Sequence, residues 1–326
     1  MNLTDPPPNQ PFKASIIPSG WLQWLVVSIS IGVFLVAFSV LYRELGTISF
    51  MQVIQEWQVL GLGTVLISLI FVIISYFASA NYDRLALNYV NYPLKFRQSI
   101  VIGFTAAAVS HNVGFAALSG GSIRFRAYTK IGLPAIDIAK IITFCSFTFF
   151  IGNAFLLGVA LLSKPLVVQQ QFGLNVVLVQ LIAGLFVTLS ILYLLASTLS
   201  KYLNQLQQLK IPIPKVTIAL QQTFFASLDL VAAAAVLYVL LPADIIVAYP
   251  ELLAAFLIAI FLGVMSTVPG GIGVFEGLML LLLPNIPRPE FLSAIIIYRV
   301  MYYILPLIVA LLVLGLKEWH SYRQLR

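Results

Sequence analysis

Two short stretches of this sequence place polar and charged residues inside otherwise apolar segments. The first runs from residue 110 to residue 128 and contains Gly120-Gly121, Arg124 and Arg126. The glycine pair permits a tight turn with open backbone amides. Such amides and nearby guanidinium groups suit an anionic group such as a phosphate. We therefore expect a phosphate-binding site here. The alternative is that both arginines only extend to a polar interface.

His111 and Asn112 precede the glycine pair. An imidazole in an apolar segment can accept a proton or hydrogen-bond a substrate, and the Asn112 amide can do the latter. The alternative for both side chains is that they only satisfy backbone groups where the helix breaks. The sequence leaves both interpretations open.

The second stretch contains Pro-Gly-Gly-Ile-Gly at 269–273 and then Glu276. The proline ends a helix, and the glycines carry the chain through a sharp loop. Glu276 falls in the first turn of the next helix, where the helix dipole favours a carboxylate. We expect it either to contact a substrate or only to cap that helix and pair with an arginine. No Gly-Lys-Ser/Thr sequence follows, which excludes a nucleotide-binding loop.

Two further charges lie inside apolar segments. Asp229 and Arg299 fall at similar depths in two predicted spans that run in opposite directions. A lone charge at the centre of a membrane helix costs about 2.5–3.5 kcal/mol. We therefore predict an intramembrane Asp229–Arg299 pair, either as a structural clamp or as part of a cavity wall. The neighbouring tyrosines Tyr298, Tyr302 and Tyr303 are expected to form a polar-tipped stripe beside Arg299.

The residues that catalysis commonly requires are scarce in this chain. The two histidines, His111 and His320, are too few for a His-rich metal site or an HExxH motif. There is no Gly-x-Ser-x-Gly sequence and no closely spaced carboxylate pair. Cys145 lies in an apolar run without a nearby histidine, which disfavours a reactive thiolate. We expect neither an enzyme nor a metal or cofactor site.

The composition indicates that these residues lie in a membrane. The chain has 326 residues, of which 61% are hydrophobic and only 9% charged, and its mean hydropathy is +1.02. Soluble domains carry roughly 25% charged residues, so this chain has too little charge to cover its surface in water. The net charge of +7 is typical of membrane proteins that keep Lys and Arg in the cytoplasm, and no nucleic-acid partner is expected.

Six apolar segments reach the length of about 20 residues that a spanning helix needs. They are residues 21–42, 58–79, 136–162, 174–199, 217–241 and 291–316. The polar stretches interrupt two further segments, 99–133 and 251–283. We therefore predict an all-α polytopic membrane protein with about six spanning helices and two re-entrant, broken hairpins.

The distribution of Lys and Arg indicates the orientation. If each broken segment enters and leaves on one face, ten Lys and Arg residues lie on one side of the membrane and three on the other. The side with the excess is cytoplasmic. We therefore predict a single transmembrane domain, 21–316, with cytoplasmic tails at 1–20 and 317–326, in the bacterial inner membrane.

The order of segments repeats along the chain. Residues 21–162 comprise span, span, hairpin and span, and residues 174–316 have the same order. The first set starts inside and the second outside, so the two sets have inverted topology. Inverted repeats with broken helices are typical of transporters, whose site lies where the broken pieces meet.

Several short motifs occur in a fixed order along the chain. They are Tyr82-Asp83-Arg84-Leu85-Ala86-Leu87, Pro93-Leu94, His111-Asn112-x-Gly114, Ser119-Gly120-Gly121-x-x-Arg124-x-Arg126-x-Tyr128 with Gly132-Leu133, and Pro269-Gly270-Gly271-Ile272-Gly273-x-Phe275-Glu276. From about residue 20 to 316, this set resembles the flippase-like transmembrane module of bacterial lysylphosphatidylglycerol synthetases, the multiple peptide resistance factor family. The resemblance implies movement of aminoacylated phosphatidylglycerol to the outer leaflet. The chain ends soon after its last span, so we expect a stand-alone form without the synthetase domain. The sequence does not identify the lipid that this form would handle.

The leading hypothesis is a lipid translocase that moves an anionic or aminoacylated phospholipid between leaflets without an ATP site. In it, Arg124 and Arg126 hold phosphate, and Glu276 contacts a cationic headgroup. The candidate substrate-binding residues are His111, Asn112, Gly120, Gly121, Arg124, Arg126, Tyr128, Gly270, Gly271, Gly273 and Glu276. The alternative is a non-transporting scaffold or partner of a separate lipid-modifying enzyme. Both hypotheses are compatible with a homo-oligomer.

Overall fold

The computed structural model describes residues 60–113, 116–207 and 213–324. No strand occurs in these ranges, which agrees with the predicted all-α class. The first predicted span, 21–42, and the amino-terminal tail lie outside the described residues.

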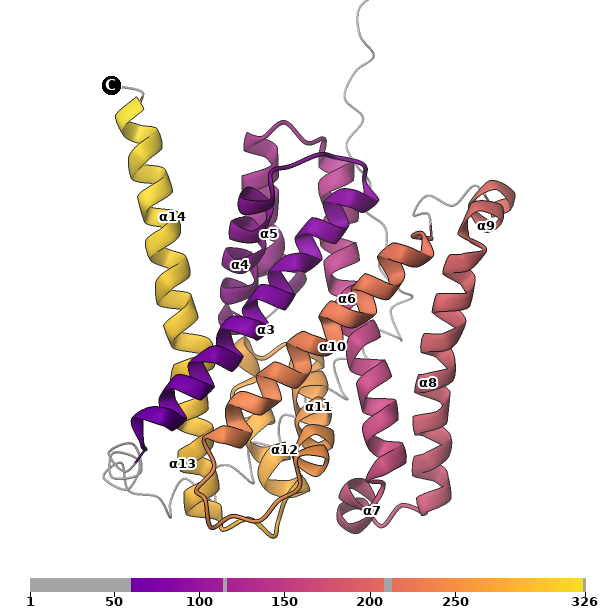
Figure 1. The fold of residues 1–326 in the computed structure, drawn as a ribbon, viewed down its shortest axis with the longest axis vertical. Coiled ribbons are helices and arrows are strands. Elements are labelled where there is room, and N and C mark those ends of the chain that lie inside the picture. Colours follow the sequence, from indigo (N-terminus) through magenta and orange to yellow (C-terminus); the bar gives the residue numbers. More distant parts are fainter. Residues whose placement is uncertain (1–59, 114–115, 208–212, 325–326) are drawn as a thin grey trace, which may run out of the picture.

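The helices keep the labels of Figure 1. In chain order they are α3 (Leu62–Tyr89), α4 (Phe96–Val113), α5 (Ala116–Lys130), α6 (Ala135–Ser163), α7 (Leu166–Phe172), α8 (Val176–Thr198), α9 (Ser200–Gln207), α10 (Val216–Val239), α11 (Tyr249–Met265), the 3₁₀ turn η1 (Pro269–Gly271), α12 (Val274–Leu282), α13 (Arg288–Tyr298), the π-helical segment η2 (Arg299–Ile304) and α14 (Leu305–Gln324).

Five of these helical stretches are long and apolar enough to cross a bilayer. They are Leu62–Tyr89, Ala135–Ser163, Val176–Thr198, Val216–Val239 and Arg288–Leu316. At 1.5 Å per residue, even the shortest, with 23 residues, is about 35 Å long, which exceeds the roughly 30 Å hydrocarbon core. They match the five predicted spans within the described residues, so this is a polytopic membrane protein. The structure extends the second predicted span from residue 79 to Tyr89.

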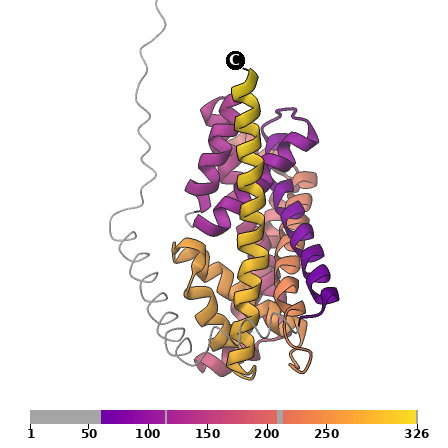
Figure 2. The same ribbon diagram turned by 90° about the vertical axis from the view of Figure 1, so that its left-hand side faces the viewer.

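The two broken segments form helical hairpins that start from opposite ends of the bundle. In Figure 1, α4 and α5 occupy the upper half, and α11 and α12 occupy the lower half. The view turned by 90° in Figure 2 has the same arrangement. The tips meet, since a Cβ built on Gly270 of η1 would lie 3.4 Å from the backbone oxygen of Asn112. The predicted hairpins are therefore present, and their ends approach each other inside the bundle.

The first hairpin breaks at a different place from the one predicted. Helix α4 ends at Val113, α5 begins at Ala116, and Gly120-Gly121 lie inside α5. The glycine pair therefore does not form the expected turn, and its amides belong to a helix. Gly120 serves close helix packing instead, because a Cβ there would come within 2.3 Å of Ser110 Oγ and 3.0 Å of the Ala106 carbonyl oxygen on α4.

The second hairpin breaks where the sequence predicted. Its glycines Gly270, Gly271 and Gly273 have φ values of 60°, 62° and 84°, a region that glycine adopts at little cost. Pro269 begins the short η1 turn, and α12 starts at Val274. Three glycines with positive φ turn the chain within a few residues and allow the tip to remain short.

The helices α3 and α10 run side by side through the middle of the bundle in opposite directions (Figure 1). Each is followed by a hairpin and then by a long helical stretch, α6 after α5 and α13–α14 after α12. This order matches the predicted inverted repeat within the described residues. The contact between α3 and α10 consequently brings corresponding elements of the two halves together at the centre.

Candidate functional site

A cavity of about 300 Å³ lies between the two hairpins. The polar and aromatic residues that line it are Ser79, Tyr82, Ser110, His111, Arg124, Cys145, Ser146, Phe149, Phe150, Asp229, Phe256, Tyr298, Tyr302 and Tyr303. They come from α3, α4, α5, α6, α10, α11, α13 and η2. A smaller space of about 60 Å³ between the hairpin tips is lined in part by His111, Gly270 and Gly271. The predicted meeting point of the broken helices is therefore a real cavity.

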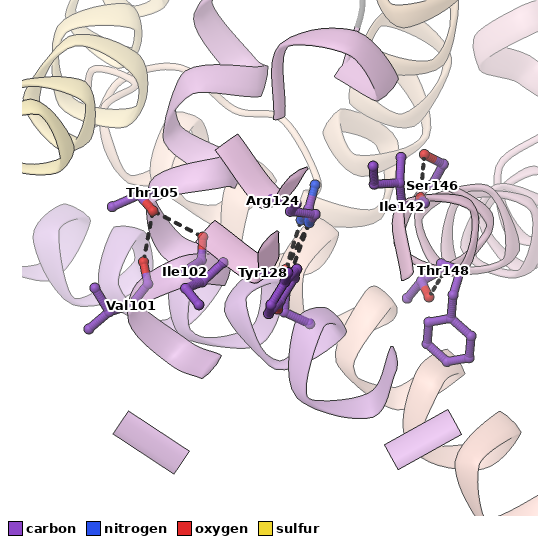
Figure 3. Close-up of polar contacts among 10 residues, drawn as sticks. Val101, Ile102, Thr105, Arg124, Tyr128, Ile142, Ser146 and Thr148 are labelled. Carbon is purple, nitrogen blue, oxygen red and sulfur yellow. Dashed lines mark hydrogen bonds and ion pairs between the residues drawn. The ribbon is translucent and has the colours of Figure 1, made fainter. Parts of the chain in front are cut away.

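One wall of the cavity is held by a buried ion pair between α3 and α5. Arg124 Nε and Nη2 lie 2.9 Å and 2.8 Å from Asp83 Oδ1 and Oδ2, and the Tyr128 hydroxyl donates to Oδ1 at 2.8 Å. The Asp83 side chain is completely buried. This bidentate pair neutralises both charges inside the protein, where an unpaired charge is energetically costly. Figure 3 shows Arg124 and Tyr128 next to each other on α5.

The pairing changes the roles expected for the two arginines. Arg124 is buried, lines the cavity and is already bound to Asp83, whereas Arg126 is exposed. Residues two positions apart on an α-helix point to different faces, so Arg124 and Arg126 do not share one phosphate site. Nη1 of Arg124 takes no part in the fork with Asp83.

Asp229, in the middle of α10, also lines the cavity. Its two carboxylate oxygens accept hydrogen bonds from the hydroxyls of Ser75 and Tyr82 on α3. The predicted pair with Arg299 is wrong. The antiparallel helix α3 packs along α10, and the last span does not. Two neutral hydroxyls of α3 therefore hydrogen-bond the Asp229 carboxylate in place of Arg299.

Arg299 belongs instead to the second hairpin. Its Nε donates to Glu276 Oε1 at 2.6 Å, and its Nη1 donates to the Gly270 carbonyl at 2.6 Å. Glu276 Oε2 accepts the Gly273 amide at 2.8 Å, and Arg299 Cζ lies 4.4 Å from the ring centroid of Tyr303. Glu276 therefore caps α12 and pairs with an arginine. This is the second of the two roles predicted for it; the first was contact with a substrate. Arg299 clamps the tip of the hairpin to the last span.

The last span is π-helical from Arg299 to Ile304. A π-helical turn inserts extra backbone into an α-helix and often occurs at functional sites. Here it coincides with the predicted tyrosine stripe. Tyr298 and Tyr302 stack with ring centroids 5.2 Å apart, and both line the cavity with Tyr303. The predicted stripe is confirmed.

The tip of α4 contacts this tyrosine stripe. The Tyr76 hydroxyl donates to the Tyr302 carbonyl at 2.9 Å and lies 3.2 Å from His111 Nδ1. Because the Tyr76 hydroxyl hydrogen is directed at Tyr302, the His111 Nδ1–H must donate to the Tyr76 oxygen. In a neutral His111, Nε2 then carries no hydrogen and can accept a hydrogen bond. Asn112 donates to the carbonyls of Ala108 and Tyr303. Asn112 thus satisfies backbone groups, whereas His111 has one ring nitrogen left.

The predicted site residues therefore divide into two groups. His111, Arg124 and Asp229 line the large cavity, and Gly270 and Gly271 line the small space beside it. The others line neither space. They are Asn112, Gly120, Gly121, Arg126, Tyr128, Gly273, Glu276 and Arg299.

Sequence reasoning missed the polar face of α3. Ser75, Ser79 and Asp83 recur every four residues, which places them on one face of a helix, and all three are buried. Their spacing was the signal that could have predicted this wall of the cavity. Among the described residues, no group of three or more His, Cys, Asp and Glu side chains is placed to hold a metal ion.

Comparison with known proteins gives consistent relatives. A protein of Synechocystis sp. (strain ATCC 27184 / PCC 6803 / Kazusa), named only as uncharacterized, is 35% identical over 258 residues, which are 78% of this chain and 79% of that protein. The inner membrane protein YbhN of Escherichia coli is 27% identical over 252 residues, 76% of this chain and 78% of YbhN. Phosphatidylglycerol lysyltransferase of Staphylococcus haemolyticus is 26% identical over 306 residues, 86% of this chain but 32% of the lysyltransferase.

The family profile described as the lysylphosphatidylglycerol synthase TM region matches residues 24–310. This range contains both hairpins, the residues that line the cavity, and four of the five long helices that the structure describes, together with the fifth, Arg288–Leu316, up to residue 310. The resemblance that the ordered motifs indicated is thereby confirmed. The chain belongs to the family of the lysylphosphatidylglycerol synthase TM region.

Proposed function

We propose that this protein moves phospholipid headgroups between the two leaflets of the membrane without a nucleotide. The observation that carries the proposal is the cavity of about 300 Å³ between two hairpins that start from opposite ends of the bundle. Transporters built from inverted repeats bind their substrates at such a meeting point. The cavity volume is that of about ten water molecules, which is enough for a phosphate with adjoining polar groups.

The lining of the cavity supports a lipid as the substrate. Arg124 contributes an Nη1 group that its fork with Asp83 leaves unused, and this group would donate to the phosphate. His111 would accept from the polar headgroup through Nε2. Apolar side chains of α6 and α11, among them Phe150 and Val264, form another part of the wall. Acyl chains would lie along this apolar part while the phosphate contacts the polar part.

Residues outside the cavity receive other roles in this proposal. Exposed Arg126 would bind phosphate at the membrane surface, where a lipid first meets α5. Glu276 would hold the second hairpin through Arg299 and the Gly273 amide, and would not bind a cationic headgroup directly. Asn112 would support the tip of α4.

The relatives favour phosphatidylglycerol or an aminoacylated form of it, since one of them is named a phosphatidylglycerol lysyltransferase. The name of YbhN favours the bacterial inner membrane. We orient the upper end of Figure 1 toward the cytoplasm. Basic residues favour this orientation, because Arg84, Lys95, Arg97, Lys201 and Lys215 flank the helix ends on that side.

A leaflet-exposure assay in proteoliposomes tests the proposal. Purified protein is reconstituted with fluorescent phosphatidylglycerol or with lysylphosphatidylglycerol, and the fraction of lipid that an impermeant reagent reaches is followed over time. Val264→Trp fills the cavity without changing a charge, because Val264 lines both spaces. Val177→Trp is the matched control, since Val177 is 60% exposed on α8.

We expect the wild type and Val177→Trp to accelerate lipid movement at least tenfold over empty vesicles, and Val264→Trp to remove most of that acceleration. No acceleration of either lipid by folded wild-type protein would refute the proposal. That outcome would favour the scaffold alternative, for which stoichiometric copurification of a lipid-modifying enzyme would be the next measurement.

A further inference from the structure

Asp229 is the buried carboxylate of the cavity that has no cationic partner. Its residue is 5% exposed. Of the two nearby arginines, Arg124 is held by Asp83 and Arg299 donates to Glu276. Among the described residues that line the cavity, no lysine is present. When ionised, Asp229 therefore carries a negative charge that no described side chain lining the cavity neutralises.

Two hydroxyl groups of the described residues stabilise this carboxylate. Ser75 and Tyr82 donate to its two oxygens. The Tyr302 hydroxyl lies 2.8 Å from Ser75 Oγ, and because the Ser75 hydrogen is directed at Asp229, Tyr302 must donate to Ser75. The chain of donors runs from Tyr302 through Ser75 to the carboxylate. This direction suits the ionised form, which can only accept hydrogen bonds.

The surroundings of Asp229 contain few other titratable groups. Facing it are tyrosine hydroxyls of α3, α13 and η2, together with one thiol of α6 and one histidine of α4 that line the same cavity. These groups are Tyr76, Tyr82, Tyr298, Tyr302, Cys145 and His111. The lining residues of α11 are apolar. The charged neighbours, Arg124 and Arg299, are already bound to Asp83 and Glu276.

We propose that Asp229 is a proton-binding site whose loading is coupled to lipid movement. The coupling rests on the proposed function, whereas the proton site does not. Burial of an unpaired carboxylate is expensive, and binding a proton removes the charge. In membrane transporters such carboxylates serve as proton relays. The step is balanced: the carboxylate and a hydronium ion from one aqueous side give a carboxylic acid and water, and the reverse step releases the proton to the other side.

Protonation of Asp229 reverses the chain of hydrogen bonds. A carboxylic acid at Oδ1 donates to Ser75, so the Ser75 hydrogen turns to the Tyr302 oxygen, and the Tyr302 hydrogen is freed. Tyr302 belongs to the π-helical segment that begins at Arg299, and it stacks on His111 with ring centroids 5.7 Å apart. The proton on Asp229 therefore changes what Tyr302 presents to the cavity, where the headgroup would lie.

Infrared difference spectroscopy of the purified protein in detergent tests the proton site without any transport. Acidification of the wild type should produce a protonated-carboxyl band in addition to those of the other Asp and Glu residues, and Asp229→Asn should lack this additional band. Ser75→Ala keeps the carboxylate but removes one donor that favours its ionised form. The band of this variant should therefore appear at a pH higher by about one unit or more. Thr198→Ala, a hydroxyl change on the exposed end of α8, is the control and should titrate as the wild type does.

An additional band that persists in Asp229→Asn, or that titrates identically in Ser75→Ala and the wild type, would overturn the assignment. So would a response to Na⁺ at constant pH in place of a response to acid. If Asp229→Asn fails to fold, the comparison of Ser75→Ala with the wild type decides, since this variant retains the carboxylate.

The coupling is tested in the proteoliposome assay. A pH difference across the membrane should change the rate of lipid movement at least threefold in the wild type, and a protonophore should abolish that difference. Asp229→Asn should move lipid at a rate that pH does not change, or not at all. If the wild type moves lipid at a rate that does not depend on the pH difference, the coupling is refuted and the proposed function is retained. Absence of lipid movement in every preparation would refute the proposed function and, with it, the coupling.

Discussion

The ion pair between Asp83 and Arg124 allows a quantitative test of the fold around the cavity. Asp83→Asn removes the negative charge with almost no change in shape. It leaves the Arg124 guanidinium, 9% exposed in its side chain, without a counter-charge, and it replaces an oxygen that the Tyr128 hydroxyl needs. Removal of one partner of a buried pair costs about 3–5 kcal/mol. That is a large part of a typical stability of about 5–15 kcal/mol.

Removal of both charges should cost less than removal of one. In Asp83→Asn combined with Arg124→Gln, no uncompensated charge stays buried, so the double variant should be more stable than Asp83→Asn alone. The resulting coupling free energy of the double-mutant cycle should be about 2 kcal/mol or more. Reversible unfolding of the protein from mixed micelles by a denaturing detergent, followed by tryptophan fluorescence or circular dichroism, measures each free energy of unfolding.

The chain contains a matched control for this cycle. Lys140 and Asp137 also lie 2.8 Å apart, but both side chains are 29% exposed. Pairs of this kind contribute about 0–1 kcal/mol, so Asp137→Asn should change stability by no more than that. Equal losses for Asp83→Asn and Asp137→Asn, or strict additivity of the two substitutions at Asp83 and Arg124, would refute the reasoning that burial makes the first pair decisive.

Three further predictions concern packing and the second hairpin, and the same unfolding measurement checks each of them. Gly152→Ala should lower the free energy of unfolding by about 1–3 kcal/mol, because its Cβ would come within 2.3 Å of Ala226 Cβ on α10. Gly184→Ala is the control: a Cβ there would have no atom within 4 Å, so the substitution should be neutral or slightly stabilising. Glu276→Gln should cost less than Glu276→Ala, because Gln keeps an acceptor for the Gly273 amide just before α12, and equal losses would contradict that capping role. Gly271→Ala should cost about 1–2 kcal/mol, because Gly271 has a φ of 62°, and unchanged stability would show that the tip tolerates a side chain.

The long helices and the second hairpin followed from the sequence alone. A bilayer demands about 20 apolar residues in succession, so stretches such as 136–162 and 217–241 predict spans within a few residues of α6 and α10. The Pro-Gly-Gly-Ile-Gly sequence predicts a break because proline removes a donor and glycine accepts positive φ. These signals are local, and the surrounding protein does not change their meaning.

The first hairpin depended on tertiary contact. A Gly-Gly pair is compatible with a turn or with a close approach of two helices, and sequence cannot distinguish the two. The contact between Gly120 and Ser110 across α4 and α5 made it a packing site inside a helix. The sequence has no proline between Val113, where α4 ends, and Ala116, where α5 begins, so no local signal as strong as that of the second hairpin predicted the end of α4.

Partner choice among the buried charges was also decided only by the tertiary structure. The sequence required that Asp229, Arg299, Arg124 and Glu276 find partners, since an unpaired charge in hydrocarbon is expensive. Asp229 and Arg299 fall at similar depths in their predicted spans, so the sequence allowed them to meet. The depth of a residue does not say which way its side chain points around the helix axis, or which helices are neighbours. Because α3 packs along α10, hydroxyls of α3 bind Asp229, and because the second hairpin packs beside η2, Glu276 binds Arg299.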